Sequence, residues 1–289
     1  MSSQVVEREG ALGNALLSTS EEDLLADYLK KNNLDRVNRE SSFVSVQNNL
    51  YSRYIKRLLD IGISAAALIV FLPVNLALGV CTFFDVGRPI FYQQARMGKD
   101  GREFIIVKFR NMKNLYDEDG KLLPPSQRVT KFGAFVRKYS LDELLNFWSV
   151  LKGDMSIIGP RPLPIVFTER MSERHKMRSS VRPGLECPRM RPGDPQQCQY
   201  QNQFENDVWY VEHISFLTDV KMLLKLFRMT FSVKQRSGAA QGAGYFAGYD
   251  ENGIATTLKR FKRMYPALWA EILENGTRAS EEESALSAK

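Results

Sequence analysis

Two adjacent carboxylates, Asp142 and Glu143, are the residues best suited to chemistry in this sequence. Ser140 precedes them, and apolar residues follow at helical spacing. This pattern predicts a helix with Ser140 as its N-cap and both carboxylates in its first turn. Unpaired backbone N–H groups and the positive end of the helix dipole attract anions at such a position. Because Arg137 comes shortly before and Arg161 follows in a stiff Gly-Pro-Arg-Pro turn, the arrangement indicates a site that handles phosphate groups.

The same residues allow a plainer interpretation. Acidic side chains in the first turn of a helix usually just stabilise that turn, by about 0.5–2 kcal/mol. Arg137 fits a solvated surface position equally well. This stretch by itself leaves the choice open, so the surrounding sequence has to decide it.

Composition narrows the class of protein. The chain has 289 residues, of which 44% are hydrophobic and 25% charged, as in folded proteins with one large core or two modest ones. Its net charge of +7 indicates an anionic partner, either nucleic acid, anionic lipid headgroups or a phosphorylated substrate. The 3 cysteines and 2 histidines lack the spacing of a disulfide framework, a zinc site or a Cys/His nucleophile pair. We expect no nucleic-acid partner, because the sequence has no nucleic-acid-binding motif.

Residues 58–84 form a long apolar segment in which Asp60 is the single charged residue. A helix of this length, at about 1.5 Å per residue, could cross a hydrocarbon core of about 30 Å. However, Pro73 near the middle removes a backbone hydrogen bond, and basic residues flank both ends, with Lys56 and Arg57 on the N-terminal side. Two positive flanks predict a re-entrant helical hairpin that turns at Pro73 and leaves by the face it entered. A spanning helix with a tolerated proline stays the alternative.

The rest of the chain alternates short strands and helices. Strand-like runs over 89–112 predict a β-hairpin, followed by a polar loop over 113–127 and a helix over 129–138. The stretch 161–191 is the most basic, which suits phosphate groups or an anionic membrane surface, although a solvated helix face explains part of it. A basic amphipathic helix over 220–231 suits a membrane interface or packing on a core about equally.

These elements predict an α+β, mainly helical protein. It would combine a re-entrant membrane helix hairpin with a cytosolic catalytic domain that has amphipathic interfacial helices and a small β-hairpin. No apolar core follows Met1, so no signal peptide is expected. The N-terminal region is expected to be mobile apart from a short helix over 20–33, and an amphipathic segment over 258–273 is interrupted at Pro266. The expected divisions are a polar N-terminal extension (1–52), the re-entrant membrane helix (53–88), the catalytic domain (89–236), a Gly-rich loop with an amphipathic helix (237–276) and a disordered tail (277–289).

An ordered series of motifs carries a resemblance to a known family. Each motif is weak alone, whereas the whole series is specific. The series consists of Lys56-Arg57, the apolar segment broken at Pro73, Lys108-Phe109-Arg110, Arg137, Ser140-Leu141-Asp142-Glu143-Leu144, Leu151-Lys152-Gly153-Asp154-Met155-Ser156, Gly159-Pro160-Arg161-Pro162 and Arg182-Pro183-Gly184-Leu185. Over about residues 53–232 the chain resembles the monotopic phosphoglycosyl transferases, also called the bacterial sugar transferase family, in their short form with an added N-terminal extension.

The resemblance implies an activity and its cofactor. The implied reaction transfers a phosphosugar from a UDP-sugar to a polyprenyl (undecaprenyl) phosphate, as the first membrane step in the assembly of a glycan such as exopolysaccharide, O-antigen, capsule or glycoprotein. Asp142 would be the nucleophile that forms an aspartyl phosphosugar and releases UMP, with Glu143 assisting beside it. Asp142 or Glu143 would bind the implied Mg²⁺, and Asp154 is a weaker candidate.

The resemblance also implies a location and binding residues. The enzyme would be monotopic, at the cytoplasmic face of the bacterial inner membrane, in contact with its lipid. A homodimer and downstream glycosyltransferases are further partners that it suggests. The residues expected to bind phosphate or substrate are Arg137, Arg161, Lys108, Arg110 and Arg182, and those expected to anchor the membrane segment are Lys56, Arg57 and Pro73.

The sequence departs from the family pattern in three places. Leu72 stands where a small polar residue commonly precedes the proline, and Leu145 stands where proline is usual, which should make the following helix more regular. Residues 186–189 differ from the usual Thr-Gly run in a loop expected to border the sugar, so the sugar is left unnamed. The alternative function is a non-catalytic, membrane-anchored scaffold of a glycan assembly complex, for which the substitution Asp142→Asn would change nothing.

Overall fold

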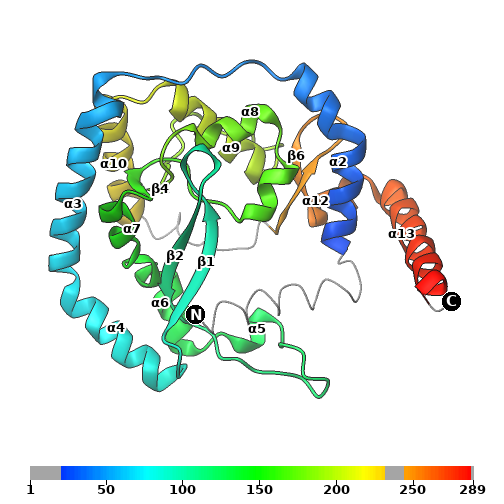
Figure 1. Cartoon of the computed structure of the whole chain (residues 1–289), viewed down its shortest axis with the longest axis horizontal. Coiled ribbons are helices and arrows are strands. Elements are labelled where there is room, and N and C mark those ends of the chain that lie inside the picture. The colour runs from blue at the N-terminus through cyan, green and yellow to red at the C-terminus, as the bar shows by residue number, and fades with distance from the viewer. Residues whose placement is uncertain (1–20, 232–243, 288–289) are drawn as a thin grey trace.

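The computed structural model describes residues 21–231 and 244–287 (Figure 1). Helices dominate these residues, and three small two-stranded sheets complete the fold. The predicted class, α+β and mainly helical, is therefore confirmed at this level.

The apolar segment forms two helices, α3 (Lys56–Val70) and α4 (Leu72–Asp85), which meet at a bend of 58°. One π-helical turn, Tyr51–Ile55, leads into α3. Pro73 lies in the first turn of α4, where its missing N–H costs no intrahelical hydrogen bond. In the part of the chain that the structure describes, no single helix is long and apolar enough to cross a bilayer, but this bent pair passes that test together. The break beside Pro73 is confirmed, and the re-entrant course stays a prediction.

The α3–α4 pair presents many apolar side chains outward, and the carboxylate of Asp60 in α3 points into the protein. Asp60 is 4% exposed, and its Oδ1 accepts hydrogen bonds from Ser156 Oγ at 3.1 Å and from the backbone N of Ile157 at 3.0 Å. These two residues belong to strand β3 (Ser156–Ile158), so Asp60 joins the apolar segment to the rest of the fold. Exposed apolar residues of the pair include Leu58, Ile69, Leu76, Val80 and Phe84.

The predicted β-hairpin is confirmed. Strands β1 (Phe91–Met97) and β2 (Glu103–Phe109) pair antiparallel around a short 3₁₀ turn, Lys99–Gly101. Asp100 in this turn has a φ of 54°, a left-handed conformation that short polar residues tolerate better than others. The hairpin places one end of β2 beside the acidic pair.

The predicted polar loop and the helix after it are also present. The loop contains one short helix, α5 (Pro125–Arg128). Thr130 then caps α6 (Lys131–Lys138), because its Oγ1 accepts a hydrogen bond from the backbone N of Gly133 at 2.8 Å.

The predicted helix start at Ser140 is wrong. Ser140 has a left-handed backbone with a φ of 55°, and its side chain caps no N–H group. The chain turns sharply there, and a 3₁₀ turn, Leu141–Glu143, precedes the short helix α7 (Asn146–Lys152). Leu145 itself has helical backbone angles and directly precedes α7, and the more regular helix expected from it stays a prediction. The two carboxylates lie on a tight turn, so no helix dipole concentrates anions at them.

Two of the family motifs pack against each other through glycines. Strand β4 (Gly184–Glu186) runs parallel to β3, with Gly184 opposite Ser156. A Cβ on Gly184 would lie 2.1 Å from the backbone N of Gly159, a distance that no side chain permits. The Gly159 turn thus packs directly on the Gly184 strand. The central core beneath this pair includes Ile106, Val150, Met155, Ile158, Tyr210 and Met222.

Helix α9 (Gln199–Glu212) crosses the core, and α10 (Phe216–Phe231) lies beside α3. The predicted amphipathic character of α10 is confirmed, since Met222 is fully buried whereas Leu224 and Phe227 are more than half exposed.

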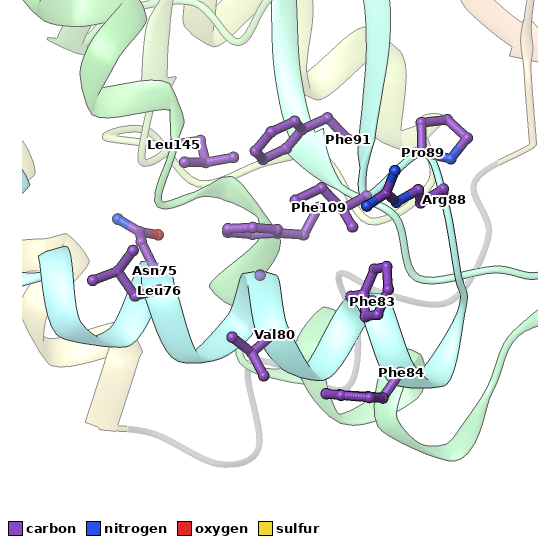
Figure 2. A pocket seen from close by; sticks show the side chains of 12 residues that line it. Asn75, Leu76, Val80, Phe83, Phe84, Arg88, Pro89, Phe91, Phe109 and Leu145 are labelled. Atoms are coloured by element: carbon purple, nitrogen blue, oxygen red, sulfur yellow. The ribbon is translucent and has the colours of Figure 1, made fainter.

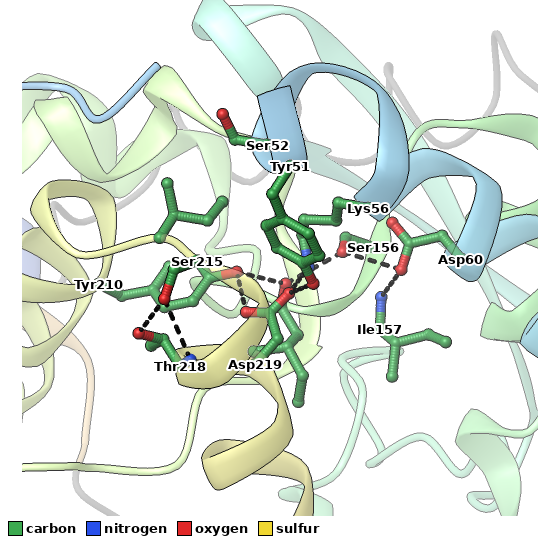
Figure 3. A network of polar contacts seen from close by, with 12 residues as sticks. Tyr51, Ser52, Lys56, Asp60, Ser156, Ile157, Tyr210, Ser215, Thr218 and Asp219 are labelled. Atoms are coloured by element: carbon green, nitrogen blue, oxygen red, sulfur yellow. Dashed lines mark hydrogen bonds and ion pairs between the residues drawn. The ribbon is translucent and has the colours of Figure 1, made fainter. Parts of the chain in front are cut away.

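A buried polar network joins the start of α3 to α9 and α10 (Figure 3). Lys56 Nζ lies 2.5 Å from Asp219 Oδ2, and both side chains are nearly buried. The hydroxyl of Tyr51 donates to the same oxygen at 2.6 Å, and that of Tyr210 donates to Asp219 Oδ1 at 2.8 Å. The ammonium of Lys56, predicted to anchor the membrane segment, is thus paired inside the protein, where it holds α3 to α10.

Residues from both ends of the chain form what we call the terminal module. It consists of α2 (Glu21–Glu40), the antiparallel strands β5 (Phe246–Tyr249) and β6 (Ala255–Thr257), α12 (Leu258–Met264) and α13 (Pro266–Ser287). Its core contains Leu25, Leu29, Ala247, Phe261, Trp269 and Ile272. In Figure 1 the module lies on the opposite side of the molecule from α3 and α4.

The terminal module corrects three expectations. The predicted N-terminal helix exists but is longer, and its apolar face is buried, so residues 21–40 are not a mobile extension. Part of the expected Gly-rich loop is strand β5. The expected disordered tail is helical as far as Ser287. Residues 1–20, 237–243 and 288–289, for which extension, loop and tail were predicted, lie outside the described residues.

The module docks through a buried aromatic and polar contact with α8 (Glu173–Lys176). The hydroxyl of Tyr249 lies 2.7 Å from His175 Nδ1, and His175 Nε2 lies 2.9 Å from Glu205 on α9. Burial alone would raise the pKa of Glu205, but hydrogen bonds from His175 and Arg174 outweigh burial and lower the pKa to about 2.

Candidate active site

Asp142 and Glu143 line a polar cleft with a volume of about 880 Å³. Its walls come from the hairpin, α6, the 3₁₀ turn that carries the pair, and the two glycine-packed motifs. The charged and amide residues that line it include Arg96, Lys108, Arg110, Asn111, Arg137, Asp142, Glu143, Asn146 and Arg161. The structure therefore gathers residues that are far apart in the sequence around the two predicted catalytic carboxylates.

Glu143 is tied to two cations. Its Oε1 accepts from Lys108 Nζ at 2.6 Å and from Arg161 Nη2 at 2.5 Å. Arg161 also pairs with Glu186 at 3.1 Å. Burial alone would raise the pKa of Glu143, but the charges of Arg161 and Lys108 outweigh burial and hold this pKa below its ordinary value. Glu143 is thus a fixed anion that orients two cationic groups of the cleft.

Asp142 is less strongly paired. It is 8% exposed, and its Oδ2 accepts from Asn111 Nδ2 at 3.2 Å. Burial, and second the charge of Glu143, raise the pKa of Asp142, while Lys108 and Arg137 offset part of this rise. Within the described residues, Asn111 is the one side-chain hydrogen-bond partner of Asp142, and no ion pair occupies its carboxylate, as a nucleophilic role would require.

The predicted phosphate-binding residues do not all reach the cleft. Lys108, Arg110, Arg137 and Arg161 line it, although Arg110 also donates to the backbone oxygen of Pro89 at 2.9 Å. Arg182 is not among its lining residues. Its Nε instead donates to the carbonyl oxygen of Gly153 at 3.0 Å, which holds the loop before β3.

Arg57, predicted as a membrane anchor, is also engaged inside the protein. Its two terminal nitrogens donate to the carbonyl oxygens of Val150 and Leu151, at 2.6 and 2.7 Å. These are carbonyls at the end of α7, which is a favourable position for a cation. Arg57 therefore fixes α3 against α7, and the basic motif at the start of α3 joins the apolar segment to the site.

Sequence reasoning did not single out several residues of the cleft. Arg96 belongs to the basic flank of the apolar segment, Asn111 to the strand-like run over 89–112, and Asn146 to the helix expected after the acidic pair. Tyr245 was placed in a loop without function. The position of Asn111 beside the Lys-Phe-Arg motif was the one available signal, because a residue just after a strand end often faces a site.

The donors that could hold a cation are hard oxygen ligands, which Mg²⁺ prefers. Asp142 and Glu143 supply carboxylates, and the buried Oδ1 of Asn146, on the same cleft, has no hydrogen-bond partner in the structure. The residues present thus fit Mg²⁺ bound by one or two carboxylates together with substrate phosphates. Among the described residues, no group of three His, Cys, Asp or Glu side chains gathers as a self-contained metal site. Asp154, the weaker candidate, pairs with Lys152 at 2.6 Å and does not line the cleft.

A second, apolar cavity of about 1060 Å³ lies between α4 and the hairpin (Figure 2). Figure 2 shows Leu76, Val80 and Phe83 of α4 on one side and Phe91 and Phe109 of the hairpin on the other. Phe109 lines both this cavity and the polar cleft, so the two spaces adjoin. The other lining residues are Asn75, Gly79, Phe84, Arg88, Pro89, Ile90 and Leu145.

Comparison with known proteins identifies the family. The profile of the bacterial sugar transferase family matches residues 51–233, which is more than half of the chain. The chain belongs to the bacterial sugar transferase family. The resemblance inferred from the motifs is therefore confirmed, and the matched residues include the bent helix pair and all the predicted site residues.

Three similar proteins illustrate the family. The chain is 41% identical over 138 residues to the uncharacterized sugar transferase EpsL of Bacillus subtilis, covering 48% of this chain and 68% of EpsL. It is 32% identical over 221 residues to the UDP-galactose-lipid carrier transferase of Erwinia amylovora, covering 69% of this chain and 45% of that protein. It is 33% identical over 184 residues to the UDP-N-acetylgalactosamine-undecaprenyl-phosphate N-acetylgalactosaminephosphotransferase of Aeromonas hydrophila, covering 61% of this chain and 43% of that protein. The chain thus spans less than half the length of the latter two.

Proposed function

We propose that this protein transfers a phosphosugar from a UDP-sugar to a polyprenyl phosphate such as undecaprenyl phosphate, as the first membrane step of glycan assembly. The observation that carries the proposal is that two binding spaces lie next to each other. One is a cationic cleft that contains the acidic pair, and the other is an apolar cavity on helix α4. The first suits a nucleotide diphosphate sugar, and the second suits the hydrocarbon chain of a lipid acceptor. The name of the Aeromonas relative, which describes transfer of a sugar phosphate to undecaprenyl phosphate, supports this assignment.

In the proposed reaction, the ionised Asp142 acts as the nucleophile. Its oxygen forms a bond to the sugar-linked phosphorus as the bond from that phosphorus to the UMP oxygen breaks, so UMP leaves with the electron pair. An oxygen of the polyprenyl phosphate then attacks the same phosphorus, and the bond to Asp142 breaks and restores the carboxylate. Lys108, Arg137 and Arg161 hold the phosphoryl oxygens, and Glu143 keeps the first and last of these cations in place.

The proposed cofactor is Mg²⁺, held by Asp142 and Glu143 with the unpaired Oδ1 of Asn146 as a further ligand. When bound, it would neutralise the charge of the diphosphate. The chain's own residues bind and orient the phosphates and exclude water from the buried carboxylate.

The proposed location is the cytoplasmic face of the bacterial inner membrane, with the α3–α4 pair as a monotopic, re-entrant anchor. The exposed apolar side chains of this pair support it, because such a surface is unfavourable in water. The acceptor's chain would lie along α4, and its phosphate would meet Arg88 or Arg110 at the border between cavity and cleft. A homodimer and downstream glycosyltransferases stay predictions.

The proposal is tested by incubating the full-length protein in detergent or lipid discs with Mg²⁺ and a panel of UDP-sugars. We expect about one UMP per protein without acceptor, label from the sugar retained on the protein, and turnover once undecaprenyl phosphate is added. Asp142→Asn should abolish all three, whereas the control Asp154→Asn, outside the cleft, should keep them. UMP release that requires both substrates together would refute the covalent step, and no release from any donor would leave the scaffold alternative.

The acceptor cavity has its own test. Val80→Trp should narrow the cavity, so the KM for undecaprenyl phosphate should rise at least several-fold while the acceptor-independent release of UMP is unchanged. Ile69→Trp is the matched control, because Ile69 is an exposed aliphatic residue of the same helix pair that does not line the cavity. Equal effects of the two variants would contradict the assignment of the cavity to the acceptor.

A further inference from the structure

The polar cleft has an aromatic part whose lining comes partly from outside the family match. Tyr92, Phe167, Tyr200 and Tyr245 line the cleft together with its charged residues. The family profile ends at residue 233, so Tyr245, which directly precedes strand β5 at the edge of the terminal module, lies outside the family match. The terminal module therefore completes a wall of the site.

Arg96 connects this aromatic part to the carboxylates. Its guanidinium is close enough to interact electrostatically with Glu143, with Arg161 and with Tyr245. Its Nε is buried without a hydrogen-bond partner, although Nη2 donates to Gln94. A diphosphate bound at Arg161 would therefore also be within electrostatic range of Arg96, which is itself within that range of Tyr245.

Tyr245 is fixed in position and yet open. The hydroxyl of Tyr200 donates to the carbonyl oxygen of Gly244 at 3.0 Å. The ring of Phe167 meets the ring of Tyr245 edge to face, with centroids 6.0 Å apart, and Phe246 beside it is fully buried. Tyr245 nevertheless keeps 56% of its surface exposed. A ring that is held by its backbone and one edge, with a free surface on the cleft, is suited to bind a ligand.

The family match indicates which part of the donor this ring contacts. The named donors of the Erwinia and Aeromonas relatives share the nucleotide but differ in the sugar. We expect residues 51–233, which the family shares, to bind the nucleotide and the diphosphate. A wall of the cleft that comes from outside these residues is better suited to contact the sugar, which differs between the donors. The face of a tyrosine ring offers apolar surface to the C–H groups of a sugar, and its hydroxyl can pair with a sugar hydroxyl.

We propose that Tyr245 is a specificity-determining residue that stacks on the sugar of the UDP-sugar donor, positioned by the terminal module. This inference rests on the proposed function, since it assumes a UDP-sugar in the cleft. It assigns the module a role in selecting the donor, beyond packing.

The test compares Tyr245→Ala and Tyr245→Phe with the control Tyr116→Ala. Tyr116 has the same exposed fraction, 56%, but lies in the polar loop and does not line the cleft. For each protein, UMP release gives kcat/KM for UDP-glucose, UDP-galactose and UDP-N-acetylgalactosamine, and UMP inhibition reports on the nucleotide subsite. The affinities of the same UDP-sugars in an Asp142→Asn background provide a second readout for any variant without turnover.

We expect Tyr245→Ala to change the ratio between the best and the second donor by about tenfold or more. Tyr245→Phe should keep most of the discrimination because it keeps the ring, and the UMP inhibition constant should be unchanged throughout. An unchanged ratio in Tyr245→Ala, or a weaker inhibition by UMP that accounts for the whole effect, would overturn the inference alone. No release of UMP by the wild-type protein from any donor would instead overturn the proposed function and, with it, this inference.

Discussion

The buried pair of Lys56 and Asp219 offers a sharp test of how the α3–α4 pair is held to the rest of the protein. The two side chains are 11% and 10% exposed and lie 2.5 Å apart. Replacing Lys56 by methionine keeps most of the apolar stem and removes the charge. Asp219 would then be a buried carboxylate without a cation.

The contacts of Asp219 determine how much stability the Lys56→Met variant should lose. Removing one partner of a buried ion pair typically costs about 3–5 kcal/mol. Here the hydroxyls of Tyr51 and Tyr210 still donate to Asp219, at 2.6 and 2.8 Å, and each such bond to a charged group contributes about 1.5–3 kcal/mol. We therefore expect a somewhat smaller loss, about 2–3 kcal/mol, for Lys56→Met. Lys56→Met with Asp219→Asn leaves no unpaired charge, so we expect a loss of only about 1 kcal/mol.

The assay is urea unfolding in detergent micelles followed by tryptophan fluorescence, for the two single variants and the double variant. Lys99→Met is the control, because Lys99 lies 3.8 Å from Asp100 in an exposed pair and should change stability little. A loss below about 0.5 kcal/mol for Lys56→Met would refute the reasoning. So would a double variant whose loss equals the sum of the single losses, since that would mean no coupling between the two groups.

Three further predictions follow from the packing and the site. The pKa of Glu205 falls from 4.5 to about 2 on folding. Its ionised carboxylate therefore contributes fully to the free energy of unfolding above about pH 4.5, and this contribution is lost as the pH falls toward 2. Its side chain is 40% exposed, so solvent screening reduces this contribution to about 1–2 kcal/mol, and the stability difference between wild type and Glu205→Gln in thermal scans should shrink over that pH range; a constant difference would contradict this. Gly184→Ala should prevent accumulation of folded protein, whereas Gly62→Ala, with open space around the new Cβ, should express normally, and a folded Gly184→Ala protein would refute the steric argument. Glu143→Gln removes the anion shared by two cleft cations, so UMP release should fall by about 100-fold or more without loss of fold by circular dichroism; full activity would exclude a role in orientation.

The local patterns of the sequence were reliable where a short segment decides its own structure. The β-hairpin, α6 and the break beside Pro73 depend on turn residues, capping and the missing N–H of proline, and the structure agrees with each prediction. Ser140 shows where this reasoning stops. A serine followed three residues later by glutamate is typical of a helix start, but the chain must turn there to pack α7 against α3, and this tertiary requirement places Ser140 in a left-handed conformation.

The basic residues show a second limit. Charge in a sequence indicates an anionic partner but not whether that partner is a substrate, a lipid or the protein itself. Arg161 and Lys108 meet Glu143 in the cleft, whereas Arg57 and Arg182 bind backbone carbonyls and Lys56 binds Asp219. No spacing rule separates these cases, because their partners lie far away along the chain.

The sequence by itself determined the apolar segment with its break, the acidic pair and the family, because these depend on residues that are close together or on an ordered series of motifs. Only the tertiary structure decided which cations face Asp142, that an apolar cavity adjoins the cleft, and that Tyr245 from the far end of the chain lines it. The physical reason is the same in each case. Contacts between distant segments depend on how the cores pack, and the buried face of α2 and the pairing of β5 with β6 bring Tyr245 to a site that lies about a hundred residues earlier in the sequence.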